Sequence, residues 1–139
     1  MAQRHDAYGK QVLRQAAGRA FRQKGPSVEI DYGGGGRARI DGTIKGEVAC
    51  EVESRVGKQV RGAVLDLLCH SLSKKLLLIL PVHMNDPAAL ATQCENILDK
   101  FMSQEDFRVV VLTGHGSNPR IEEDVRATKR ALRELGVLR

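Results

Sequence analysis

The chain has 139 residues, of which 42% are hydrophobic, and it carries a formal net charge of +5 with an isoelectric point near 9.4. This length predicts one domain, residues 1–139, large enough to bury a core of its own. No run of about 18 apolar residues occurs and the first ten residues contain no apolar segment, so we expect neither a membrane span nor a signal peptide.

The predicted elements begin with a helix over about residues 6–24, where apolar residues recur at helical spacing until Gly25-Pro26 ends the pattern. Residues 27–32 and 37–44 read as two strands of a hairpin whose turn holds four glycines. Residues 47–53 form a third strand. These three strands are expected to be consecutive and antiparallel.

The second half alternates between helices and strands. A helix is predicted over residues 57–72, and the unbroken apolar run at residues 76–80 is typical of a central strand covered on both faces. Asp86 and Pro87 then mark the start of a helix that reaches about residue 103, and residues 109–112 form another buried strand. Asn118 and Pro119 repeat the same start signal before a final helix that ends at Gly136. The order αβββαβαβα indicates an α/β fold with a mixed sheet flanked by helices.

Positive charge is concentrated in the first 24 residues. This segment holds six basic residues and one acidic residue, an excess of five that equals the formal charge of the whole chain. Such a basic stripe suits a polyanion, so Arg14, Arg19 and Arg22 are candidates for contacts with DNA phosphates. A solvated helix face is the alternative interpretation.

Three acidic side chains are expected to converge on adjacent strands. Asp41 lies on the second predicted strand, and Glu51 and Glu53 lie two residues apart on the third, so the two glutamates point to the same face. Carboxylates that meet in this way form a site for a hard divalent cation such as Mg²⁺. The alternative is that they are surface residues paired with nearby bases such as Lys45 or Arg55.

This order of acids and elements resembles the PD-(D/E)xK nuclease superfamily, which has the restriction-endonuclease-like fold, over roughly residues 3–80. Asp41 matches the motif aspartate and Glu51 the motif glutamate. Glu53 stands where the family usually has lysine, although some branches carry an acid there, and Ile40 stands where a proline is usual. The resemblance implies that Asp41, Glu51 and Glu53 are catalytic, and that Asp41 and Glu51 bind Mg²⁺ or Mn²⁺.

The missing motif lysine requires a substitute if the resemblance holds. Related nucleases can draw an activating lysine from the helix after the third strand, which makes Lys58 our candidate, while Arg55 and Arg61 are candidates for phosphate binding. The alternative for all three is ordinary surface charge.

The function that these features imply is metal-dependent hydrolysis of DNA phosphodiester bonds by metal-activated water. The rival hypotheses are a non-catalytic nucleic-acid-binding domain of the same fold and an α/β assembly domain whose acids are surface residues. The three cysteines, Cys50, Cys69 and Cys94, lack metal-binding spacing and are expected to be buried free thiols in a reducing cytoplasm.

Cleavage of both DNA strands would favour a two-fold homodimer. Its surface would be formed by one side of the last helix, with Ile121, Val125 and Leu132, together with Val137 and Leu138. The alternative is that these residues cover the sheet.

Overall fold

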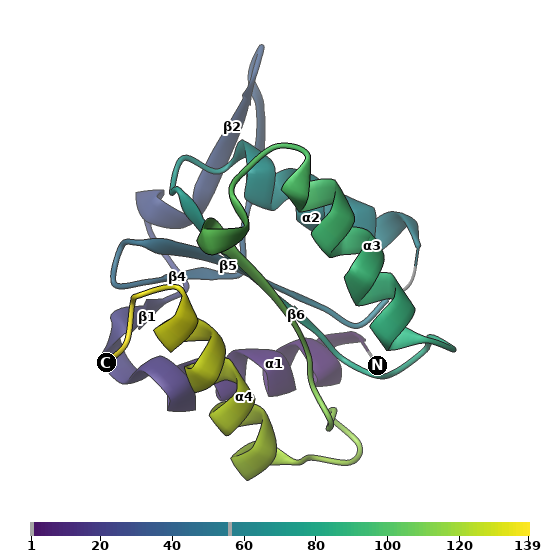
Figure 1. The fold of residues 1–139 in the computed structure, drawn as a ribbon. Coiled ribbons are helices and arrows are strands. Elements are labelled where there is room, and N and C mark those ends of the chain that lie inside the picture. The colour runs from purple at the N-terminus through teal and green to yellow at the C-terminus, as the bar shows by residue number, and fades with distance from the viewer. Residues whose placement is uncertain (1, 56) are drawn as a thin grey trace.

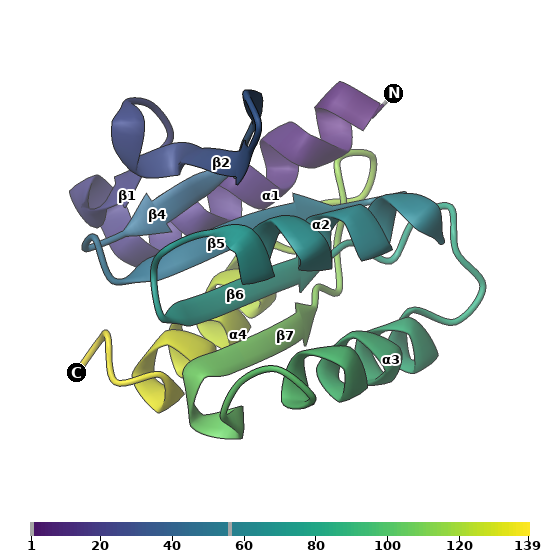
Figure 2. The ribbon, with the colours of Figure 1, turned by 90° about the horizontal axis from the view of Figure 1, so that it is seen from above.

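The structure is a computed structural model that describes residues 2–55 and 57–139. Its centre is a five-stranded mixed sheet with the strand order β1-β4-β5-β6-β7, whose strands are all labelled in the second of the two views (Figures 1 and 2). The first three strands in this order are antiparallel, and β5, β6 and β7 are parallel. Their bounds are β1 (Phe21–Arg22), β4 (Gly42–Ile44), β5 (Val48–Glu53), β6 (Lys74–Ile79) and β7 (Phe107–Val111). The α/β class and the mixed sheet predicted from the sequence are confirmed.

Two pairs of helices cover the two faces of the sheet. On one face lie α1 (Ala2–Ala17) and α4 (Ile121–Glu134), and on the other lie α2 (Lys58–Cys69) and α3 (Pro87–Asp99) (Figures 1 and 2). Side chains of β5 alternate between these layers: Cys50 and Val52 pack toward α1 and α4, whereas Ala49 packs toward α2 and α3. Strand β6 is apolar from Leu76 onward because both of its faces are covered.

The first half of the chain contains more strands than predicted. Helix α1 ends at Ala17, and after a 3₁₀ turn (Gly18–Ala20) the chain forms β1, within residues predicted to be helical. Gly18 adopts a left-handed conformation with φ of 59°, which breaks the helix, and buried Phe21 then pairs with Ile44. Gly42 permits this pairing, because a side chain there would overlap the Phe21 ring.

The glycine-rich hairpin forms a separate sheet. Strands β2 (Glu29–Gly33) and β3 (Gly36–Arg39) pair with each other and project from the body of the molecule (Figure 1). The predicted strand at residues 37–44 is therefore two strands, β3 and β4, which separate at Ile40 and Asp41. Ile30 and Ile40 are buried against the core beneath α2, and this anchors the base of the hairpin.

The helix starts were predicted with mixed success. The Asp86 side chain accepts a hydrogen bond from the Ala89 N–H at 3.0 Å, which confirms the predicted N-cap of α3. Asn118 does not cap α4, because its backbone pairs with His115 in a tight turn and the helix begins at Ile121. Cys69 is exposed, contrary to expectation.

The residues predicted as a dimer surface pack against the body of the chain. Leu132 and Val137 are buried in the core between the sheet and the two helices α1 and α4, and Ile121, Val125 and Leu138 pack partly buried against it. This arrangement matches the alternative interpretation, in which they cover the sheet.

Candidate active site

The predicted metal ligands meet just before the first residue of β4. Strand β4 pairs with β5 only as far as Gly42 and Cys50, so the next residues of β5 have no neighbouring strand on that side. The Asp41 side chain replaces the missing strand, and its Oδ2 accepts a hydrogen bond from the Val52 N–H at 2.7 Å. The Asp41 N–H in turn donates to Oε1 of Glu51 at 2.8 Å. Asp41 and Glu51 are therefore neighbours, linked through the backbone N–H of Asp41.

This pair lies in an environment that disfavours two negative charges. Glu51 is only 8% exposed, and burial, together with the neighbouring Asp41 carboxylate, raises its pKa to about 9. Burial also raises the pKa of Asp41, against the effect of the Val52 hydrogen bond and of Lys10. A divalent cation bound between the two carboxylates would offset both the desolvation and the repulsion.

The third predicted acid has a different partner. Glu53 is buried, and its Oε1 accepts hydrogen bonds from the Arg55 backbone N–H at 3.0 Å and from the Arg55 Nε–H at 2.9 Å. This ion pair supplies the counter-charge that Glu53 needs, so Glu53 is turned toward Arg55. Glu53 also acts on Asp6 of α1. The pKa of Asp6 is raised, first by burial and second by the neighbouring Glu53 carboxylate.

A basic groove lies beside Asp41. It lies between α1 and strand β3 with the segment after β1, has a volume of about 510 Å³, and is called the α1–β3 groove below. Asp41 lies in its wall, and Lys10 Nζ is 3.8 Å from Asp41 Oδ1. The residues that line it are Ala7, Lys10, Arg14, Gln23, Lys24, Arg39, Ile40 and Asp41. Four of these carry positive charge and one carries negative charge, so the groove suits a phosphate backbone.

The basic residues predicted from the sequence are distributed over several surfaces. Arg14 lines the α1–β3 groove, where it donates a hydrogen bond to Gln23 at 3.0 Å. Arg19 and Arg22 are exposed on the turn after α1 and on β1, and neither lines this groove. Arg61 is exposed on α2.

Lys58 is not the lysine beside the carboxylates. It is exposed at the start of α2, and among the described residues it makes no hydrogen bond or ion pair. The lysine next to Asp41 is Lys10, which the sequence analysis missed. Lys10 and Arg14 are one helical turn apart, so the sequence indicated that they share a face of the helix. Only the packing of α1 beside Asp41 places this face in the α1–β3 groove. Lys24 and Arg39 of the same groove were also missed.

The donor set fits Mg²⁺ or Mn²⁺ in part. Two carboxylates offer hard oxygen ligands, and Mg²⁺ commonly takes one or two protein carboxylates while it keeps water and substrate phosphate oxygens. Across residues 2–55 and 57–139, no cluster of three or more histidine, cysteine, aspartate or glutamate side chains is arranged to hold a metal ion. The site therefore suits an ion that arrives with its own waters or with the substrate.

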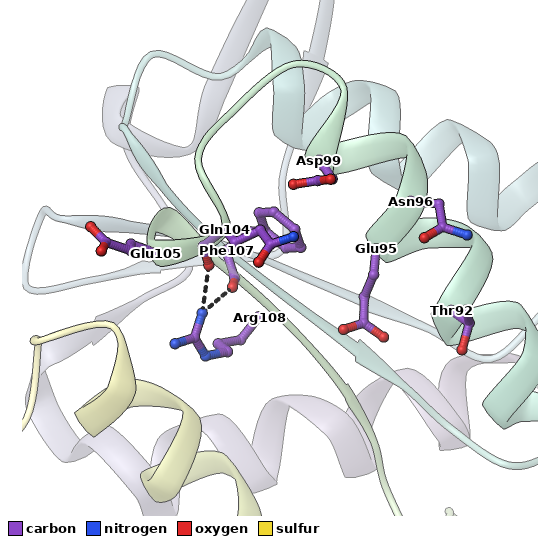
Figure 3. Close-up of a pocket in the computed structure, with 8 residues that line it drawn as sticks. All are labelled: Thr92, Glu95, Asn96, Asp99, Gln104, Glu105, Phe107 and Arg108. Atoms are coloured by element: carbon purple, nitrogen blue, oxygen red, sulfur yellow. Dashed lines mark hydrogen bonds between the residues drawn. The ribbon is translucent and has the colours of Figure 1, made fainter.

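A larger hollow lies on the opposite layer and contains none of the predicted site residues. It has a volume of about 550 Å³ between α3 and the start of β7 (Figure 3). Its lining includes Glu95, Asp99 and Glu105, and its one base, Arg108, donates to the backbone carbonyls of Gln104 and Phe107. An acidic lining with its only cation already bound does not suit a phosphate backbone, and we favour the α1–β3 groove despite its smaller volume.

No helix in the described part of the chain is long and apolar enough to cross a membrane. Comparisons with protein-family models, curated proteins and solved structures found no match to this chain.

Proposed function

We propose that this protein is a metal-dependent DNA endonuclease related to the PD-(D/E)xK superfamily. The observation that carries the proposal is the position of Asp41, whose N–H donates to Glu51, in the wall of the α1–β3 groove, whose lining has four bases and one acid. A phosphate backbone bound by these bases would lie beside Asp41, where a divalent cation could replace the proton that the pair holds at neutral pH. The element order with its acidic strands, which prompted the resemblance, agrees with this reading.

The chain's own side chains would bind and orient the substrate. Arg14, Lys24 and Arg39 hold the phosphates along the groove, and the Lys10 ammonium, close to Asp41, offsets negative charge on the phosphate to be cleaved. Asp41 and Glu51 would ligate Mg²⁺ or Mn²⁺, which when bound would polarise that phosphate and lower the pKa of the attacking water. The backbone hydrogen bonds at Asp41 and Val52 fix the two carboxylates relative to the sheet.

The remaining parts of the proposal concern place and assembly. DNA is the partner, and a reducing cytoplasm is the compartment that three free thiols suit. A homodimer would let two active sites cut both strands. Because the residues first considered for its surface pack against the core, any dimer would need another face.

The experiment is cleavage of supercoiled, linear and branched DNA in the presence of Mg²⁺, Mn²⁺ or EDTA. We expect cleavage that requires the metal and falls by at least about 10²-fold in Asp41→Asn and Glu51→Gln, with the fold retained. Glu95→Gln, which removes an exposed carboxylate on α3, is the matched control and should cleave normally. Equal cleavage by Asp41→Asn and the control would contradict the proposed site.

The second candidate is a non-catalytic nucleic-acid-binding domain of the same fold. The observation in its favour is the Glu53–Arg55 ion pair, because a glutamate replaces the usual motif lysine and is already neutralised. Salt-dependent DNA binding without cleavage in any metal would select this candidate.

A further inference from the structure

The outer side of α1 presents an uncovered row of side chains, all but one of them polar. Tyr8, Val12 and Leu13 on its inner side are buried against the sheet and α4. The exposed residues on its outer side, called the α1 crest below, are Arg4, Ala7, Gln11, Arg14 and Gln15. Glutamine amides and arginine guanidinium groups are the side chains that most often form paired hydrogen bonds with adenine and guanine edges. Because Arg14 also lines the α1–β3 groove and is assigned there to a phosphate, Arg4, Gln11 and Gln15 are the crest side chains with the chemistry to read bases.

A second basic groove lies on the other side of this crest. It runs between α1 and α4, has a volume of about 420 Å³, and is called the α1–α4 groove. Three bases and one acid lie among its lining residues, which are Gln15, Ile121, Glu122, Val125, Arg126, Lys129 and Arg133. The bases recur along one side of α4 at helical spacing. Helix α1 is thus flanked by a basic groove on each side.

The width of α1 is compatible with the major groove of duplex DNA. A helix with its side chains is about 10–12 Å across, and the major groove of B-form DNA is about 12 Å wide with one phosphate backbone on each side. We propose that the α1 crest enters the major groove of double-stranded DNA, with one backbone in the α1–β3 groove and the other in the α1–α4 groove. The strand in the α1–β3 groove is then the one that lies beside Asp41.

The same geometry disfavours other nucleic acids. A single strand has one backbone and would need only the groove that contains Asp41. Double-stranded RNA has a deep and narrow major groove that does not admit a helix. The inference rests on the proposed nuclease function for its choice of strand, but the binding mode can be tested without cleavage.

The experiment measures the binding of fluorescent 25-base-pair duplex DNA, of one of its single strands and of duplex RNA, in EDTA and over a range of salt. The test variant is Arg126→Gln with Lys129→Gln. The control is Gln93→Glu with Lys100→Gln, which changes the charge by the same two units on exposed positions of α3 and its C-terminal end, beyond the opposite face of the sheet. A fourth probe is duplex DNA with glucosylated hydroxymethylcytosine, whose bulky groups fill the major groove and leave the phosphates unchanged.

We expect the test variant to bind duplex DNA about 10- to 60-fold more weakly near 0.1 M salt, since each lost phosphate contact costs roughly eightfold there, and the salt slope should fall by about 1.8. Its single-strand affinity should match that of the control. Duplex RNA and the glucosylated duplex should both bind the wild-type protein more weakly than plain duplex DNA.

Two results would overturn the inference. Equal losses on single and double strands would mean that the α1–α4 groove does not receive a second backbone. Full affinity for the glucosylated duplex would mean that α1 stays outside the major groove. Neither result depends on metal or hydrolysis, so failure of this binding mode and failure of the proposed nuclease activity are distinguishable.

Discussion

Glu51→Gln should stabilise the folded chain, and the gain should grow with pH. Burial and the adjacent Asp41 raise the pKa of Glu51 from its ordinary value of 4.5 to about 9. Between these two values the folded chain binds a proton that the unfolded chain has released, so the free energy of unfolding of the wild-type protein decreases as pH rises. Glutamine cannot ionise, and the variant loses this contribution to the pH dependence.

The size of the effect follows from proton linkage. One proton changes the free energy of unfolding by about 1.4 kcal/mol for each pH unit within this window. From pH 6 to pH 8 the wild-type protein should therefore lose up to about 2.7 kcal/mol relative to Glu51→Gln. Because the pKa of Asp41 is raised as well, the two carboxyls titrate together and the slope belongs to the pair.

Urea denaturation at pH 5, 6, 7 and 8 in EDTA measures this difference. Glu95→Gln on the exposed side of α3 is the control and should follow the wild-type curve at every pH. Addition of 10 mM Mg²⁺ at pH 8 should stabilise the wild-type protein by about 1.4 kcal/mol for a dissociation constant near 1 mM, and should leave Glu51→Gln unchanged. Parallel pH profiles for wild type and Glu51→Gln would refute the buried carboxylate pair.

Three further predictions concern packing and the basic surface. Asp124→Ala removes a buried carboxylate that accepts hydrogen bonds from α1 and from the loop after β7, and it should lower the free energy of unfolding by about 3 kcal/mol in urea denaturation. Gly9→Ala should destabilise by about 1–3 kcal/mol because the new methyl group would overlap β5, whereas Gly62→Ala on α2, where the space is open, should stabilise by up to about 1 kcal/mol. Arg14→Gln should reduce the salt slope of DNA binding by about one, and Arg19→Gln should reduce it less, because only Arg14 lines the α1–β3 groove.

The sequence predicted those features that repeat along the chain. Alternation along β5 placed Glu51 and Glu53 on one face and Val52 on the other, and the apolar run of β6 predicted a central strand. These patterns are reliable because each position repeats the same choice between core and solvent. The Asp86 cap of α3 was predictable for a similar reason, since a single short-range hydrogen bond determines it.

The features that were missed depend on contacts between distant segments. Strand β1 has only two residues, too few for any periodicity. It forms because Phe21 pairs with Ile44, and Gly42 leaves room for the Phe21 ring. Lys10 was interpreted as one of several bases on a helix, because nothing in its neighbourhood along the chain indicates Asp41. The binding partner of Glu53 was also open, since Lys45 and Arg55 were both plausible from spacing alone.

In the proposed nuclease site, the ammonium group of Lys10 would take the place of the usual motif lysine. A lysine at position 53 would project from the same face of β5 as Glu51, but this chain has a glutamate there, and Arg55 neutralises it. The charge that faces Asp41 comes instead from Lys10 on a different element. Gly9 makes this exchange workable, because the absence of a side chain lets α1 lie directly on Val52 and places the next residue at the carboxylate pair. The electrostatics of the site are thus coupled to the packing of α1, so the helix that we propose to enter DNA is also the one that carries the lysine to Asp41.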